Sequence, residues 1–124
     1  MLKLIYCLHR LPSMTREDFQ RYWREEHAPL VRAAAPHVGI VRYVQSRTVD
    51  HPVAAATAAG RAIPTGDGED YDGVAEIWFA DDAFAAEPTE EGQRHARILA
   101  EDEAKFIDFA RSRIMMTREN IVIG

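Results

Sequence analysis

The order of strand-like and helix-like segments is the feature that most constrains the fold of this sequence. Strand formers run together or alternate with polar residues in four segments, at residues 2–10, 39–49, 71–80 and 112–117. Helical periodicity follows the first and the third of these, at residues 15–35 and 88–109. This order, β-α-β-β-α-β, predicts the ferredoxin-like α+β fold, in which a four-stranded antiparallel sheet carries both helices on one face.

Length and composition predict one folded domain over residues 1–124. A chain of 124 residues has the size of a single compact domain, and 47% hydrophobic with 28% charged residues is ordinary globular usage. The formal net charge is −5 and no dense run of Lys or Arg occurs. Since binding to phosphates requires the opposite sign, nucleic acid is not expected as a partner.

Membrane insertion and export are not expected either. No apolar run approaches the roughly 20 residues that cross a bilayer. The apolar N-terminus, residues 1–11, continues into charged residues without a small-residue cleavage site. The single cysteine, Cys7, cannot form an internal disulfide, which fits a reducing compartment. We therefore expect a cytoplasmic protein without a membrane segment.

The first helical segment indicates its own start and its buried side. Thr15, three residues before Asp18, resembles a weakened capping box. Aromatic residues and a histidine then recur at i, i+4 and i+8, a spacing that places them on one side of a helix. They are Phe19, Trp23 and His27. We expect this stripe to face the sheet.

Two prolines interrupt the same segment. Pro29 cannot donate to the carbonyl of Glu25 and disfavours helical geometry at Ala28, so a kink or restart is expected there. The second helical piece is expected to end before Pro36. His27 therefore lies at a break that leaves a backbone carbonyl exposed, where a pocket can open.

The strand patterns predict an association surface. The second strand is expected to point Val41, Tyr43 and Gln45 to one side and Ile40, Arg42 and Val44 to the other. In the third strand Val74, Glu76 and Trp78 share one side, opposite Ala75, Ile77 and Phe79. Both sides are largely apolar, yet the helices cover only one of them. We expect a homodimer through the uncovered sheet face, with the apolar tail 119–124 able to reach across it.

Residues 51–70 form the least regular part of the chain. The alanine-rich stretch "VAAATAAGRA" favours a short helix, and the following "IPTGDGEDY" is typical of a loop because of its Pro and Gly residues. A long irregular insert in a small domain is usually either a functional loop or a disordered one. The sequence does not choose between these two.

Two side chains are candidates for proton transfer, His27 and Glu76. Histidine titrates near neutral pH, and His27 lies beside Trp23 at the helix break. A carboxylate on an inward strand face loses its solvation and can serve as acid or base, which applies to Glu76. Structural roles are the alternatives: His27 caps the helix or donates to the exposed carbonyl, and Glu76 pairs with Arg42 or another strand arginine.

Metal and nucleotide sites are not expected. The histidines are scattered, and Glu91 with His95, at i and i+4, is half of a helical metal site without its partners. The acidic residues 67–73 lack the spaced ligands and terminal glutamate of a calcium loop. No glycine-rich phosphate loop, nucleophile elbow or dinucleotide fingerprint occurs. We therefore expect no cofactor and no metal.

Four stretches resemble one known family. They are "LIYCLHRLPSMTREDFQRYWREEHAPLV", "YVQ", "YDGVAEIWF" and "EDEAKFID". Together they are similar to the EthD-like family of the dimeric α+β barrel superfamily, over nearly the whole chain. The resemblance implies a ferredoxin-like monomer and a dimer whose two sheets close into a barrel. A related lactone-isomerase branch has a histidine at the position of His27, and a cysteine where this chain has Ile77.

The residues and the resemblance favour an enzyme that needs no cofactor and acts on a small hydrophobic carbonyl compound or lactone, in a catabolic or polyketide pathway. The expected reaction is isomerisation, cyclisation or dehydration, with His27 as general acid or base and Glu76 orienting or polarising the substrate. Further side chains are expected to hold a substrate oxygen or to line the ligand-binding pocket. They are Trp23, Tyr43, Trp78, Tyr6 and Arg42.

A non-catalytic protein is the alternative. In one form it carries a small hydrophobic ligand as an accessory of an oxidoreductase system of the ether-degradation type, and its affinity survives the loss of His27. In the other it is a dimeric module in which His27 and Glu76 only satisfy buried hydrogen bonds. An enclosed cavity onto which both His27 and Glu76 open would favour the enzyme.

Overall fold

A computed structural model describes residues 1–66 and 70–124 of the chain. The strands are β1 (Leu2–Leu8), β2 (Ile40–Arg47), β3 (Gly73–Phe79) and β4 (Arg113–Thr117). The helices are α1 (Arg16–Tyr22), the π-helix η1 (Trp23–His27), α2 (Ala28–Val38), α3 (Pro52–Ala59), α4 (Glu90–Glu103) and the 3-10 helix η2 (Phe109–Arg111). The acidic turn expected at residues 67–73 lies partly outside the described residues. Within the described part, no helix has the length and apolar character needed to span a bilayer.

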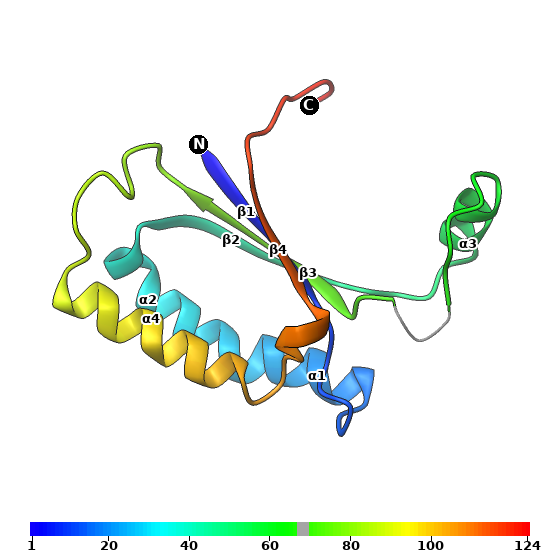
Figure 1. The fold of residues 1–124 in the computed structure, drawn as a ribbon, viewed down its shortest axis with the longest axis horizontal. Coiled ribbons are helices and arrows are strands. Elements are labelled where there is room, and N and C mark those ends of the chain that lie inside the picture. The colour runs from blue at the N-terminus through cyan, green and yellow to red at the C-terminus, as the bar shows by residue number, and fades with distance from the viewer. Residues whose placement is uncertain (67–69) are drawn as a thin grey trace.

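The strands form one antiparallel sheet, and the predicted fold class is confirmed. Over the described residues the sheet has four strands in the order β2-β3-β1-β4, which is the ferredoxin-like arrangement. Figure 1 shows α1, α2 and α4 below the sheet and only the C-terminal tail rising above it among the described residues, while α3 stands apart beyond the ends of β2 and β3. The fold therefore has one covered sheet face, which packs on the helices, and one open face.

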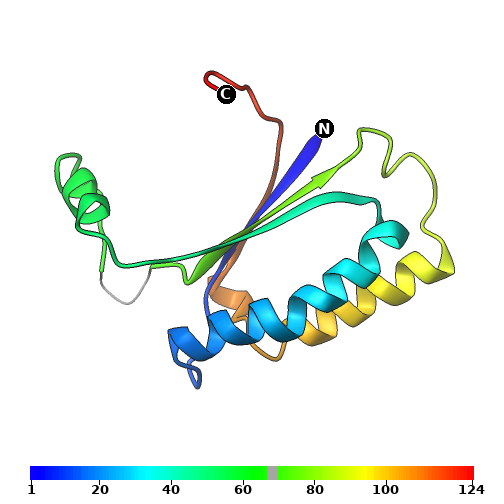
Figure 2. The ribbon, with the colours of Figure 1, turned by 180° about the vertical axis from the view of Figure 1, so that it is seen from behind.

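The first helix runs as one continuous rod from α1 through η1 to α2, as Figure 2 shows from behind. Thr15 caps it as predicted, because its hydroxyl accepts from the backbone N–H of Asp18 at 3.0 Å. The irregularity predicted at Pro29 takes the form of a π-turn, in which the N–H of Ala28 donates to the carbonyl of Trp23.

The helix end predicted before Pro36 is wrong. Helix α2 continues through Pro36 to Val38 and ends where Gly39 adopts a left-handed φ of 78°. Pro36 lies on the exposed side of the helix, where a carbonyl that loses its helical partner is hydrated. A proline at this exposed position is therefore tolerated inside the helix, and the helix does not end before it.

A β-bulge corrects the predicted sides of β2. The pairing with β3 shifts register between Ile40 and Arg42, so Val41 is the extra residue. Ile40 consequently lies on the covered face with Tyr43, whereas strict alternation had placed it with Arg42. Tyr43 and Arg42 lie on opposite sides of the sheet, as predicted.

The core lies between the covered sheet face and the helices. It consists of Leu8, Phe19, Trp23, Ala75, Phe106 and Ile107. The stripe predicted to face the sheet is buried in full, since Phe19, Trp23 and His27 are 0%, 2% and 4% exposed. A Cβ on Gly73 would stand 2.5 Å from the Trp23 ring, so a glycine is needed for this indole to pack against β3 at this position. This packing positions the residues that follow Trp23.

Candidate functional site

His27 ends the π-turn and points into the protein. Its Nδ1 lies 2.8 Å from Oδ2 of Asp102, at the end of α4, and its ring packs 5.1 Å from that of Phe106. Both partners of this pair are almost fully buried, at 4% and 5% exposure. The hydrogen-bond partner of His27 is therefore a carboxylate from the other helix, whereas the structural alternative had expected a backbone carbonyl.

Asp102 is held as an anion by its neighbours. Burial opposes its ionisation, but hydrogen bonds from the Tyr22 hydroxyl, at 2.6 Å, and from His27 outweigh it and lower the pKa of the Asp102 carboxyl. Lys105 adds a positive charge 3.6 Å from the same carboxylate. An ionised carboxylate can only accept, so the hydrogen bond with His27 is donated by Nδ1.

His27 itself is neutral at pH 7. Burial lowers the pKa of the imidazole below 6.5, although Asp102 acts in the opposite direction. With the proton fixed on Nδ1, Nε2 carries the lone pair, and Nε2 has no hydrogen-bond partner among the described residues. The arrangement is that of a base oriented by a carboxylate, as in the nucleophile-activating dyads of hydrolases.

A small cavity lies against this imidazole, between the sheet and the helices. Its volume is about 50 Å³, which is room for roughly three or four water molecules. The lining is mostly apolar and consists of Tyr6, Leu8, Trp23, His27, Val31, Ile40, Tyr43, Ala75, Ile77, Leu99, Glu103 and Ile107. A reacting group placed there would meet His27 in surroundings with little water.

Glu103 is the second titratable group of the cavity. Burial raises the pKa of its carboxyl to about 7, the nearby charge of Asp102 adds to the rise, and a hydrogen bond with Tyr6 opposes it. Burial and the charge of Glu103 raise the pKa of the Tyr6 hydroxyl in turn. At neutral pH the carboxyl is present in both protonation states, so it can act as an acid beside the base His27.

Sequence reasoning missed Asp102 and Glu103. Their signal lies in the periodicity of the helical segment predicted at residues 88–109, since Leu99, Asp102, Glu103 and Phe106 follow one another at i, i+3, i+4 and i+7. Two acids within the buried stripe of a helix break its pattern in the same way as His27 breaks that of the first helix.

Trp23 and Tyr43 form the wall of the cavity nearest to β2. The indole Nε1 of Trp23 donates to the Tyr43 hydroxyl at 3.2 Å, and the Gln45 amide donates to the same oxygen at 3.2 Å. Gln45 also donates to the carbonyl of Trp23 at 2.9 Å, which is the carbonyl of the π-turn. Strand β2 thus stabilises the π-turn that positions the side chain of His27.

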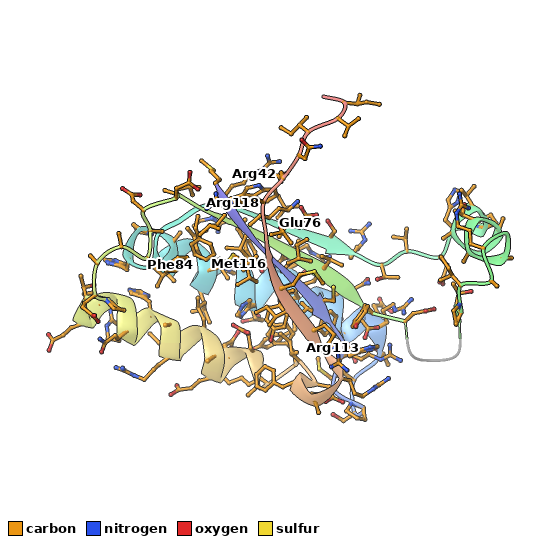
Figure 3. The ribbon with its side chains drawn as sticks, turned by 45° about the horizontal axis from the view of Figure 1, so that its top comes forward. Arg42, Glu76, Phe84, Arg113, Met116 and Arg118 are labelled. Atoms are coloured by element: carbon orange, nitrogen blue, oxygen red, sulfur yellow. The ribbon has the colours of Figure 1, made fainter. Side chains whose placement is uncertain are left out.

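The structure separates Glu76 from His27. Side chains alternate along β3, so Ala75 and Ile77 face the cavity and Glu76 stands on the open face, where Figure 3 shows it with Arg42. The expectation that Glu76 faces inward beside His27 is wrong, because both sides of β3 are apolar and the strand pattern alone does not say which side the helices cover.

On the open face Glu76 pairs with a lysine. Its partner is Lys3 of β1, a diagonal cross-strand neighbour, and not the expected arginine. Arg42 stacks instead over Trp78, 4.6 Å from the ring centre, and the Trp78 indole donates to Glu119 at 2.7 Å. Of the ligand-binding residues predicted, Tyr6, Trp23 and Tyr43 meet at the cavity, whereas Arg42 and Trp78 do not.

The fold and the site together define a class of protein: a ferredoxin-like α+β chain with a buried cluster of titratable groups between its helices and its sheet. The EthD domain family matches residues 11–110, most of the chain, and the protein belongs to this family. The predicted family is thereby confirmed. No curated protein sequence matches the chain significantly.

Solved structures support the fold. An EthD family protein from Bacillus halodurans is similar with a TM-score of 0.58 and 20% identity, over 97% of this chain and 99% of that one. An EthD-like protein from Ralstonia eutropha is similar with a TM-score of 0.60 and 14% identity, over 98% of this chain and 95% of that one. HapK from Hahella chejuensis is similar with a TM-score of 0.54 and 14% identity, over 100% of this chain and 96% of that one. At these identities the likeness extends to the fold alone.

Proposed function

We propose that this protein is an acid-base enzyme that acts on a small, largely apolar carbonyl compound or lactone by isomerisation, cyclisation or dehydration. The observation that carries the proposal is the Nδ1–Asp102 hydrogen bond of 2.8 Å, which leaves Nε2 of His27 as a proton acceptor at a cavity shared with Glu103. Its cytoplasmic location, favoured by the lone Cys7, is part of the same proposal.

The reaction begins with proton transfer from the carbon next to the carbonyl. His27 Nε2 takes this proton, so that a C–H bond breaks and an N–H bond forms, and Asp102 stabilises the resulting imidazolium. Protonated Glu103 donates its proton to the carbonyl oxygen, which gives a neutral enol and leaves a carboxylate. Neither step requires a redox partner, since no electron leaves the substrate.

The fate of the enol distinguishes the reactions. Return of the proton from the imidazolium to a different carbon isomerises the substrate, while the Glu103 carboxylate takes back the hydroxyl proton. If a hydroxyl group stands one carbon further on, the Glu103 carboxylate takes back the enol proton and passes it to that hydroxyl, which leaves as water while the carbonyl and a new carbon–carbon double bond form. The imidazolium of His27 then releases its proton to solvent, which completes a dehydration. The cavity of about 50 Å³ admits the reacting carbonyl and its neighbouring atoms, so the substrate is compact at this end.

We also propose that the open sheet face pairs with a second copy of the chain. Apolar side chains stand on this face, among them Ile5, Val44, Val74 and Met115, and no helix of the described residues covers them. The tail beyond β4 extends away from the body (Figure 1), and Ile121, Val122 and Ile123 are exposed by 72%, 84% and 93%. Such surfaces are stabilised when a second sheet and tail cover them.

A non-catalytic ligand carrier, accessory to an oxidoreductase system, is the second candidate. Asp102 accepts hydrogen bonds from both the Tyr22 hydroxyl and Nδ1 of His27, and a purely structural polar cluster would satisfy its buried groups in the same way. In this case the cavity binds a ligand and His27 takes no proton from it.

Proton exchange separates the two candidates without knowledge of the substrate. A panel of small cyclic ketones, unsaturated lactones and β-hydroxy ketones is incubated in D2O with wild type, His27→Gln and Glu76→Gln, and loss of the signal of the proton beside the carbonyl is followed by NMR. The enzyme proposal expects at least one compound to exchange about 100-fold faster with wild type and Glu76→Gln than with His27→Gln. Exchange that is equally fast with all three, or a compound that binds wild type and His27→Gln alike without exchange, would contradict it.

A further inference from the structure

A second cluster of potential ligands lies at the opposite end of the helix pair from His27. It contains His37, in the last turn of α2, and Glu91 and His95, one turn apart near the start of α4. One ligand atom from each of the three lies within 4.8 Å of the other two. The sequence shows only half of this cluster, because His37 is more than 50 positions away from its partners.

Close packing of the helices brings the three side chains together. At Gly92, a Cβ would stand 2.7 Å from the carbonyl oxygen of His37, so only a glycine allows α4 to approach α2 this closely. The rings of His37 and His95 consequently stack with their centres 4.6 Å apart and their planes 4° from parallel. The close packing of the helices therefore accounts for the contact between the two imidazoles.

The cluster already attracts a positive group. Nη2 of Arg94 lies 2.8 Å from Oε2 of Glu91 and 3.4 Å from Nε2 of His95. Since a guanidinium only donates hydrogen bonds, this geometry gives Nε2 of His95 the role of acceptor, with its lone pair directed toward Arg94. A cationic nitrogen is thus within hydrogen-bond reach of both the imidazole and the carboxylate, and a metal ion at this place would find the same two donors.

We propose that His37, Glu91 and His95 bind one divalent transition-metal ion, with Zn²⁺ as the best match, and that the ion displaces Arg94 from Glu91. Two imidazoles and one carboxylate form a donor set that Zn²⁺ uses when a fourth position is left to water. The inference is independent of the proposed acid-base chemistry, because it concerns other residues at the other end of α2 and α4.

The rearrangement that binding requires is small. Bonds of about 2.0–2.1 Å in a tetrahedral site place donor atoms roughly 3.3 Å apart, against 3.9 Å between Nε2 of His95 and Oε2 of Glu91. The in-plane lone pairs of two parallel imidazoles do not converge, so the exposed His37 ring turns about its Cβ–Cγ bond. A groove of about 610 Å³, lined by His37 and Phe84 among others, gives the ion and its water a path of entry.

Zinc titration of the full chain tests the proposal. Competition with a chromogenic chelator measures affinity and stoichiometry, and the visible absorption of bound Co²⁺ measures coordination geometry. We expect one Zn²⁺ per chain, a loss of affinity of about tenfold or more in each of His37→Ala, Glu91→Gln and His95→Ala, and tighter binding in Arg94→Gln, where the competing guanidinium is gone. His51→Ala, which removes an exposed histidine remote from the cluster, is the matched control and should bind as wild type.

The proposal is overturned by any of three results. These are the absence of stoichiometric binding at micromolar Zn²⁺, wild-type affinity in the ligand variants, and affinity in Arg94→Gln no higher than in wild type. Far-UV circular dichroism confirms that each variant is folded; because all three ligands lie at the surface or half-buried, their replacement leaves the core intact.

Discussion

The two faces of the sheet carry similar residues in different surroundings. On the open face, Glu76 pairs with Lys3, and their side chains are 28% and 14% exposed, so the pair keeps some contact with solvent. On the covered face, Asp102 meets His27 with both side chains almost fully buried. An ion pair that keeps contact with solvent contributes little to stability, whereas burial changes which group of a pair holds the proton. Only the covered face therefore has the properties of an acid-base site.

Activity should show the largest difference between the faces. His27→Gln removes the proton acceptor and should lower the exchange rate or turnover by roughly 10²–10⁴-fold. Glu76→Gln should leave the rate as in wild type, because its carboxylate lies on the other side of the sheet. The rates are measured with any compound that wild type exchanges. Equal losses in the two variants would remove the distinction between the faces.

The next largest difference between the faces should appear in the free energy of unfolding when a side chain is truncated. Phe19→Ala empties a fully buried position between Trp23 and Phe106 and should lower the free energy of unfolding by about 3–5 kcal/mol. Met115→Ala, on the open face and 49% exposed, should cost the monomer less than about 1 kcal/mol. Urea denaturation at low protein concentration gives both values, and a costly Met115→Ala in the monomer would show that the open face has a covering layer.

The pH dependence of stability sharpens the comparison at Glu103. Burial raises the pKa of this carboxyl from 4.5 to about 7, so the folded state holds a proton that the unfolded state has lost. The stabilisation is fully present below pH 4.5 and is lost as the pH rises through 7. Wild type should therefore lose on the order of 2 kcal/mol relative to Glu103→Gln over this range. Parallel stability curves for the two proteins would contradict a buried Glu103.

The smallest effect is expected at the proposed dimer surface. Met115 and Met116 are neighbours on β4, each 49% exposed, and they point to opposite faces of the sheet. Met115→Lys should weaken dimerisation by about tenfold or more, because it places a charge among apolar side chains. Met116→Lys is the matched control and should associate as wild type in light scattering and sedimentation. Dissociation by Met116→Lys alone would place the interface elsewhere.

The fold was predictable because it depends on order and periodicity. The stripe of Phe19, Trp23 and His27 repeats at helical spacing, and its burial follows from that spacing. The β-bulge at Val41 could not be predicted, because no residue pattern around it indicates a bulge. This one extra residue moves Ile40 to the other face of the sheet. Local patterns determine elements, but pairing between strands determines which faces they present.

The site was predictable in part. His27 stood out because a histidine beside a tryptophan interrupts a polar helix. Its partner Asp102 is 75 positions away and belongs to a run of acids that is ordinary on a helix surface. Glu76 was predicted at the site because a single acid in an apolar strand is conspicuous. Its side chain instead lies on the open face, where it pairs with Lys3 and keeps contact with solvent. Contacts between distant segments decide such cases.

The tautomer of His27 tests the central claim most directly. Long-range proton-nitrogen NMR correlation, with the signals assigned by comparison with His27→Gln, distinguishes Nδ1–H from Nε2–H and follows protonation with pH. The structure predicts a neutral imidazole at pH 7 that carries its proton on Nδ1, leaves Nε2 unprotonated and titrates below pH 6.5. An imidazolium at pH 7, or a neutral ring with its proton on Nε2, would contradict the role of His27 as the base of this site.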